Sequence, residues 1–164
     1  MNPRQLLTAP ERNNFRVVAT APCVAYLYLV RPMAPLDLTK AAPRSPREEL
    51  RGLCMLPRMI DIARAKLPSG NAGDYEIGRE NTLSAGVLAV FGMSAAQFVK
   101  VVHDARTDDD VAEHLWATAT MPPQALSARL RRVTVADAPA DLLPDFQGFY
   151  GIQHPPDRRV FDVL

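Results

Sequence analysis

The chain has 164 residues, of which 48% are hydrophobic and 23% charged, so its composition indicates one globular domain and excludes an integral membrane protein. Its 19 basic and 18 acidic residues give a net charge of +1, which removes the electrostatic case for a nucleic-acid or anionic-membrane partner. We expect neither partner.

Residues 1–32 differ from the rest, with four arginines, one acid and an apolar run from Cys23 to Val30. Eight residues are too few to span a membrane and make a poor signal peptide, so we expect a cytoplasmic protein. One interpretation is an extension outside the native fold, with translation starting naturally at Met33. The other is a strand over Val24–Val30, paired with residues 15–19 or bound to a partner. The rest, 33–164, is expected to be a single helical domain.

The fifteen prolines cluster towards the two ends, and none lies between Ser69 and Met121. Because an internal proline disrupts a helix, regular helix should concentrate in that middle stretch. A first helix is predicted from Ser45-Pro46-Arg47-Glu48, which has the pattern of a capping box. Pro57 predicts a kink in this helix. Its apolar stripe is Leu50, Leu53, Leu56, Ile60, Ala63 and Leu67.

Four further helices follow from start and stop signals. One covers residues 82–91 and ends at Gly92, and the next starts at the Ser94 capping box. A third starts at Thr107, followed by three aspartates, and a fourth covers residues 124–132. Residues 141–150 could form a short additional helix. The predicted fold class is mainly α, a small bundle of four to five helices with irregular, proline-rich ends.

Several of these motifs also carry a family resemblance. They are Leu36-Asp37-Leu38-Thr39, Pro43-Arg44-Ser45-Pro46-Arg47-Glu48, Leu56-Pro57-Arg58-Met59-Ile60-Asp61 and Ala63-Arg64-Ala65, followed by Asp74-Tyr75, Val90-Phe91-Gly92 and Thr107-Asp108-Asp109-Asp110-Val111. The chain resembles a bacterial family catalogued as domain of unknown function 5069, well over residues 36–120 and loosely beyond. The resemblance implies a fold and a size. It implies no reaction, cofactor or catalytic residue.

The predicted first helix places basic side chains on neighbouring turns. Three or four guanidinium groups beside a helix N-terminus could bind a carboxylate or phosphate, and a tyrosine after the glycine-rich turn could cover such a pocket. The alternative is a solvated face on which Arg58 pairs with Asp61 at i,i+3. The predicted ligand-binding residues are Arg44, Arg47, Arg58, Asp61 and Tyr75.

Two other kinds of chemistry are compatible with the sequence. Asp110 and His114 are spaced i,i+4, and His103 lies on the preceding helix, so the three could bind one divalent metal. Asp110 is more simply explained by the helix dipole. Cys54 could act as a nucleophile with one of these histidines, although a lone helical cysteine is more often buried.

The leading functional hypothesis is therefore a helical domain that binds an anionic small molecule at the arginine face, either as a binding protein or as an enzyme of unknown reaction and cofactor. One alternative is a non-catalytic interaction module that docks through the apolar N-terminal run or the proline-rich tail. Another is a metal-dependent enzyme using His103 and His114.

Overall fold

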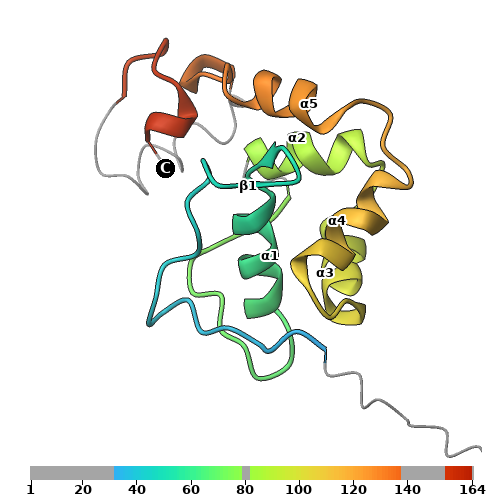
Figure 1. The fold of residues 1–164 in the computed structure, drawn as a ribbon. Helices are drawn as coiled ribbons and strands as arrows, with labels where there is room; N and C mark the ends of the chain where they lie inside the picture. The colour runs from blue at the N-terminus through green and yellow to red at the C-terminus, as the bar shows by residue number, and fades with distance from the viewer. Residues whose placement is uncertain (1–31, 79–81, 138–153, 164) are drawn as a thin grey trace, which may run out of the picture.

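The computed structural model describes residues 32–78, 82–137 and 154–163. Within them, five helices follow a short antiparallel hairpin, which confirms the predicted mainly α fold class (Figure 1). The elements are β1 (Glu49–Leu50), β2 (Leu53–Cys54), α1 (Leu56–Ala65), α2 (Thr82–Val90), α3 (Ala95–Asp104), α4 (Asp108–Trp116), α5 (Pro123–Leu130), and two 3-10 turns, η1 (Val135–Asp137) and η2 (Val160–Asp162).

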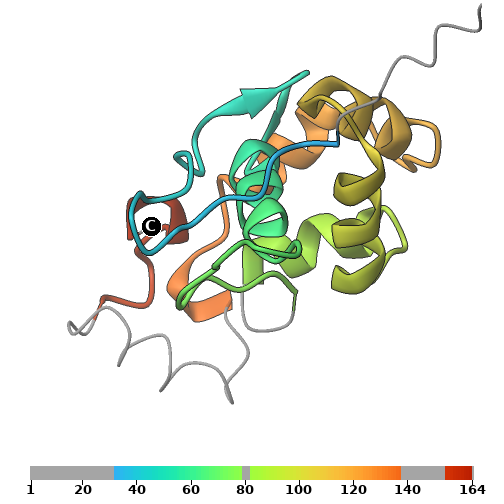
Figure 2. The same cartoon turned by 90° about the horizontal axis from the view of Figure 1, so that it is seen from below.

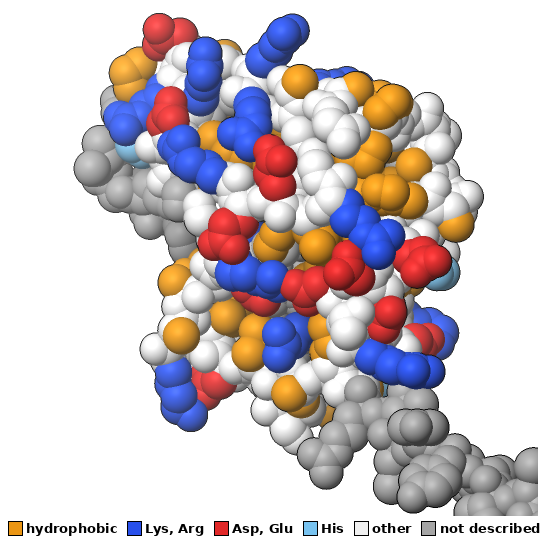
Figure 3. Space-filling model, in the orientation of Figure 1, with side chains coloured by type: hydrophobic (Ala, Val, Ile, Leu, Met, Phe, Trp, Pro, Cys, Tyr) orange, Lys and Arg blue, Asp and Glu red, His pale blue; other side chains and the backbone are white. Residues whose placement is uncertain are grey.

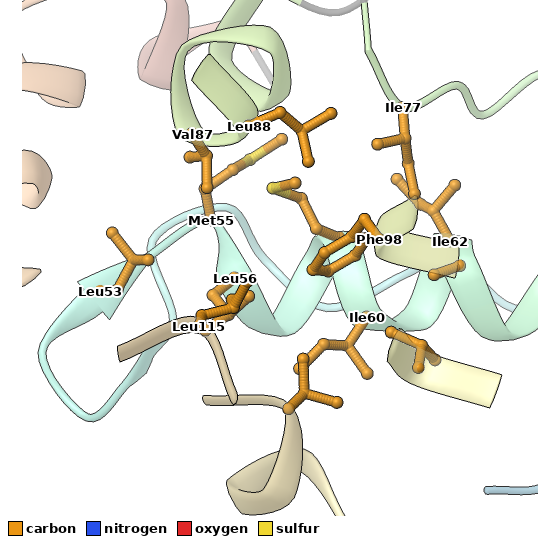
Figure 4. Close-up of a cluster of buried hydrophobic side chains, with 14 of the residues drawn as sticks. Leu53, Met55, Leu56, Ile60, Ile62, Ile77, Val87, Leu88, Phe98 and Leu115 are labelled. Atoms are coloured by element: carbon orange, nitrogen blue, oxygen red, sulfur yellow. The ribbon is translucent and has the colours of Figure 1, made fainter. Parts of the chain in front are cut away.

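The central element of the fold is α1, and the other helices lie around one end and one side of it (Figures 1 and 2). Nine of its ten residues are buried, including one arginine and one aspartate. Apolar side chains of α2, α3 and α4 converge on it, as Figure 4 shows for Val87, Phe98 and Leu115. Helix α1 therefore forms the middle of one shared core and places two charged residues inside it.

The helix predicted to start at Ser45 does not form there. The Ser45 N–H donates to Glu48 Oε1 (3.2 Å) and the Glu48 N–H donates to the Ser45 carbonyl (3.1 Å), so the pattern makes local bonds. These bonds close a turn, and the chain then continues into β1. The prediction of a helix N-cap at Ser45 is therefore wrong.

The hairpin turn explains why the chain leaves helical geometry. Arg51 and Gly52 connect β1 to β2 with φ of 47° and 82°. Two successive residues with positive φ suit the tight turn of a two-residue hairpin, and glycine adopts that conformation at no steric cost. The turn brings Leu53 and Cys54 into the core, where both are fully buried.

The predicted kink at Pro57 is also wrong, because α1 begins only at Leu56. Pro57 occupies the first turn of the helix, where a backbone N–H would have no intrahelical partner. The proline therefore starts α1 and does not bend it.

The other predicted helices are confirmed, with ends shifted by a residue or two. Ser94 and Thr107 form capping boxes with Gln97 and Asp110, and these boxes start α3 and α4. Gly92 follows α2 with φ of 60°. The possible helix over 141–150 and the possible hairpin within 1–31 lie outside the described residues.

No single helix of the described segments is long and apolar enough to cross a membrane; α2 and α3 pass that test only as a pair bent by 76°.

Two glycines allow a test of the fold. Gly86 lies within α2, and a Cβ there would meet Leu130 Cδ2 at 3.6 Å, an ordinary contact. We expect Gly86→Ala to stabilise the protein by about 0.5–1 kcal/mol, because alanine favours the helix. We expect Gly52→Ala to destabilise it by about 1–2 kcal/mol, because an alanine at positive φ is strained. Urea unfolding of both variants measures the difference, and equal midpoints would contradict the hairpin turn.

Candidate functional site

A buried carboxylate on α1 is the centre of the predicted ligand-binding residues. Asp61 is only 6% exposed. Arg44 gives it three hydrogen bonds: from the backbone N–H to Oδ2 (2.9 Å), from Nε to the same oxygen (2.9 Å) and from Nη2 to Oδ1 (2.8 Å). Bidentate arginine–carboxylate pairing is a strong, geometrically specific ion pair. The Asp61 charge is thus compensated within the protein.

Arg44 also reaches α4. Its Nη1 donates to Asp108 Oδ2 at 2.5 Å, and Asp108 is the first residue of that helix. Partial burial disfavours the charged guanidinium, but the bonds to Asp61 and Asp108 outweigh burial and raise the Arg44 pKa above its usual value. Arg44 therefore links the segment before the hairpin to both α1 and α4.

Arg58, the other charged residue inside α1, is 8% exposed. Its Nη1 donates to the Arg44 carbonyl (3.2 Å), and its guanidinium carbon lies 5.2 Å from the centre of the Tyr75 ring, within cation–π range. Asp61, which the i,i+3 spacing assigned to Arg58, takes its hydrogen bonds from Arg44 instead. Arg44, Arg58, Asp61 and Tyr75 thus form one cluster, the arginine cluster.

Arg47, the fifth predicted residue, belongs to a different contact. Its Nη2 donates to the Phe161 carbonyl (2.6 Å) and to Asp162 Oδ1 (2.8 Å), so it binds the C-terminal turn η2. Arg51 donates from Nε to Asp109 Oδ1 (2.7 Å). These two arginines precede α1 and share no helix face with Arg58. Figure 3 shows basic and acidic side chains interleaved in a band across this side of the molecule.

The proposed nucleophile Cys54 is fully buried. Its backbone N–H donates to Ser127 Oγ (2.8 Å), and that hydroxyl donates to the Gly52 carbonyl (2.7 Å). Burial raises the pKa of the Cys54 thiol, which disfavours the reactive thiolate. Cys54 therefore packs as a small hydrophobic residue against α5.

A groove of about 540 Å³ lies elsewhere, where the end of α2 meets α3 and α4. Its apolar residues are buried or half-buried and form a floor, whereas its polar residues are exposed and form a rim. The five predicted ligand residues are not among those that line it. The floor is Phe91, Met93, Val101 and Ala105, and the rim is Gly92, Gln97, Lys100, Asp104, Asp110, His114 and Thr118.

The carboxylates of the rim are already occupied as hydrogen-bond acceptors. Asp104 accepts from Lys100 Nζ (2.7 Å) and lies 2.9 Å from His103 Nδ1; these contacts lower its pKa, the one with Lys100 most. Asp110 accepts the backbone N–H groups of Arg106 (3.0 Å) and Thr107 (3.1 Å), which lower its pKa in the same order. Asp110 therefore caps α4, whereas Asp104 pairs with two side chains of its own helix.

The hydrogen-bond donors of the rim are more available to a ligand than its carboxylates are. Lys100 has a side chain that is 75% exposed, so its pairing with Asp104 is easily exchanged. His114 lines the groove on α4, and its ring has no hydrogen-bond partner among the residues that the structure describes. The rim thus presents an ammonium and an imidazole above an apolar floor.

The predicted metal set of His103, Asp110 and His114 is not assembled. His103 contacts Asp104, and Asp110 caps its own helix. Within residues 32–78, 82–137 and 154–163, no group of three or more His, Cys, Asp or Glu side chains is arranged to hold a metal ion. Asp110 and His114 both line the groove.

Comparison with protein families matches residues 40–143 to a model described as "Domain of unknown function (DUF5069)". The chain belongs to this family. The matched range contains Arg44, Asp61 and every groove residue, whereas Met33 and η2 lie outside it. No curated protein matches the chain. Membership in DUF5069 therefore confirms the family resemblance and assigns neither the arginine cluster nor the groove a function.

The buried ion pair makes a direct prediction. Arg44→Ala leaves the Asp61 carboxylate buried with Arg64, 4.0 Å away, as its remaining ion-pair partner. We expect a loss of about 2 kcal/mol, below the 3–5 kcal/mol typical of fully buried pairs because a third of Arg44 is exposed. Arg44→Lys should lose less, since it keeps the charge without the fork geometry.

The matched control is Lys40→Ala, which breaks the exposed ion pair with Asp37. Its urea midpoint should stay unchanged, because solvent-exposed pairs contribute little. If Arg44→Ala unfolded at the same urea concentration as Lys40→Ala, the pair with Asp61 would not have the structural role that its burial indicates.

Proposed function

We propose that the protein is a small-molecule-binding domain whose site is the groove between the end of α2, α3 and α4. The ligand has an apolar body and an anionic acceptor group such as a carboxylate. The observation that carries the proposal is the combination of an apolar floor with exposed donors at the rim. The proposal assigns binding and no reaction.

The volume of the groove is suitable for a small-molecule ligand. A volume of about 540 Å³ falls inside the range of roughly 300–1,000 Å³ that small-molecule sites occupy. Phe91, Met93 and Val101 offer the ligand apolar surface, and Phe91 is held in place by stacking on Trp116, with ring centres 5.7 Å apart. A supported aromatic floor of this kind favours the apolar part of a ligand.

The rim favours a ligand whose polar group accepts hydrogen bonds over one whose polar group donates them. Asp104 and Asp110 already accept hydrogen bonds, so a ligand ammonium would compete with contacts inside the protein. A ligand carboxylate could replace Asp104 as the partner of Lys100 and take a second hydrogen bond from His114. Exchange between two exposed carboxylates costs little.

The arginine cluster is a less favourable place for the anionic ligand that the sequence suggested. Arg44 is bonded to two carboxylates, and Arg47 is bonded to Asp162 and a backbone carbonyl. An anion binding there would compete with a buried carboxylate for the same guanidinium. We therefore give these arginines a structural role.

The cytoplasmic and bacterial setting that the sequence suggested stays part of the proposal.

The test uses anilinonaphthalene sulfonate, whose aromatic rings and anionic group match the floor and the rim. We expect the folded chain to enhance the fluorescence of this dye and decanoate to displace it. Lys100→Ala and His114→Ala should each weaken dye binding by about tenfold, the equivalent of one charged hydrogen bond. Val101→Glu should abolish it by placing a charge on the floor.

The matched control is His103→Ala, which removes an imidazole from α3 that does not line the groove. It should leave dye affinity unchanged, and thermal unfolding would verify that each variant is folded. Equal affinities for His114→Ala, Val101→Glu and the unaltered chain would show that the dye does not bind in the groove and would refute the assignment.

A further inference from the structure

The described chain begins beside the groove. Its first buried residue, Met33, donates its backbone N–H to the Ala105 carbonyl (3.3 Å), and Ala105 is part of the groove floor. In both ribbon views the chain enters the fold next to α3 and α4 (Figures 1 and 2). The 31 preceding residues are therefore attached at the edge of the candidate site.

The sequence attached there suits an apolar groove. Residues 23–30, Cys-Val-Ala-Tyr-Leu-Tyr-Leu-Val, carry no charge, and Arg31 and Pro32 separate them from Met33. In extended form, alternate side chains point to opposite sides, so Leu27 and Leu29 would share one face and Tyr26 and Tyr28 the other. One face could cover the floor while the tyrosine hydroxyls remain near water.

The chain between Val30 and Met33 is long enough for the run to reach the groove and short enough to keep the run near it. Three residue steps join Val30 to Met33, which allows a separation of up to about 10 Å. A tether of this length holds the run near the groove at an effective concentration of the order of millimolar. Weak apolar contacts are sufficient for occupancy at such a concentration.

We propose that residues 23–30 of this chain dock in the α2–α3–α4 groove and that ligands bind there by displacing them. The inference rests on the proposed function, because it takes the groove to be the binding site. It gives the strongly apolar segment before the domain a binding surface within the same chain. The N-terminal run then acts as an internal competitor that sets the threshold for ligand binding.

The natural cysteines allow a test on the full chain. Cys54 is fully buried, so a maleimide nitroxide should label Cys23, at the start of the run. We expect the label to weaken the NMR amide signals of Val101, Ala105 and His114. Val160 and Phe161 belong to η2, drawn in red, which lies away from α3 and α4 in Figures 1 and 2, so their signals should keep their intensity. Reduction of the nitroxide should restore the lost signals.

A double substitution tests the consequence for binding. Leu27→Glu with Leu29→Glu should release the run and reduce the broadening at the groove to the level that an undocked tether gives. It should also tighten dye binding by about tenfold if about nine tenths of the molecules hold the run in the groove. The matched control, Leu6→Glu with Leu7→Glu, places the same charges in the same segment outside the run and should change neither measurement.

The outcomes separate this inference from the proposed function. Groove signals weakened equally in the labelled chain and in its Leu27→Glu with Leu29→Glu variant, with dye bound in the groove, would overturn docking and leave ligand binding intact. Broadening at the groove without any dye or decanoate binding would support docking and refute the small-molecule proposal. Broadening centred on Val160 and Phe161 would overturn docking in the groove by placing the run on the other side of the fold.

Discussion

The ion pair between Arg44 and Asp61 is the interaction on which the rest of the structure depends. Helix α1 is buried on nearly every side, so a carboxylate in its middle would be strongly unfavourable without a partner. Arg44 supplies that partner from 17 residues earlier and extends a further contact to the start of α4. The pair thereby fixes the segment before the hairpin, the central helix and α4 relative to one another. Because α4 carries one wall of the groove, the geometry of the candidate site depends on an ion pair outside it.

The fold could be predicted where the signals and the bonds they make lie within a few residues. Ser94 with Gln97 and Thr107 with Asp110 form the capping boxes that the sequence indicates, and a helix follows each. The same kind of pattern at Ser45 and Glu48 makes local bonds without a helix. The next residues decide the outcome, because Gly52 favours a tight turn and the hairpin buries Leu53. A capping pattern therefore identifies a turn, and tertiary packing determines whether a helix or a strand comes after that turn.

The candidate site was less predictable, because its parts are joined only by the fold. No helical spacing relates Arg44 to Asp61, and the sequence assigned Asp61 to the nearer Arg58. The groove takes Phe91 and Met93 from the end of one helix and His114 from another. The i,i+4 spacing of Asp110 and His114 singled out a helix face that lines the groove but suggested a metal. Their true neighbours, an apolar floor and a capped helix end, became visible only when α2, α3 and α4 were in place.

The contact between Arg47 and η2 affects how the protein folds during synthesis. Arg47 lies 114 residues before Phe161, whose carbonyl it binds, and Arg131 lies over the Phe161 ring. Val160 and Phe161 are both buried in the core that the hairpin begins. As the chain is made from its N-terminus, α1 to α5 can leave the ribosome and pack while this corner of the core still lacks its cover. The hairpin side of the domain is therefore exposed to water, and to other chains, until residue 161 has emerged.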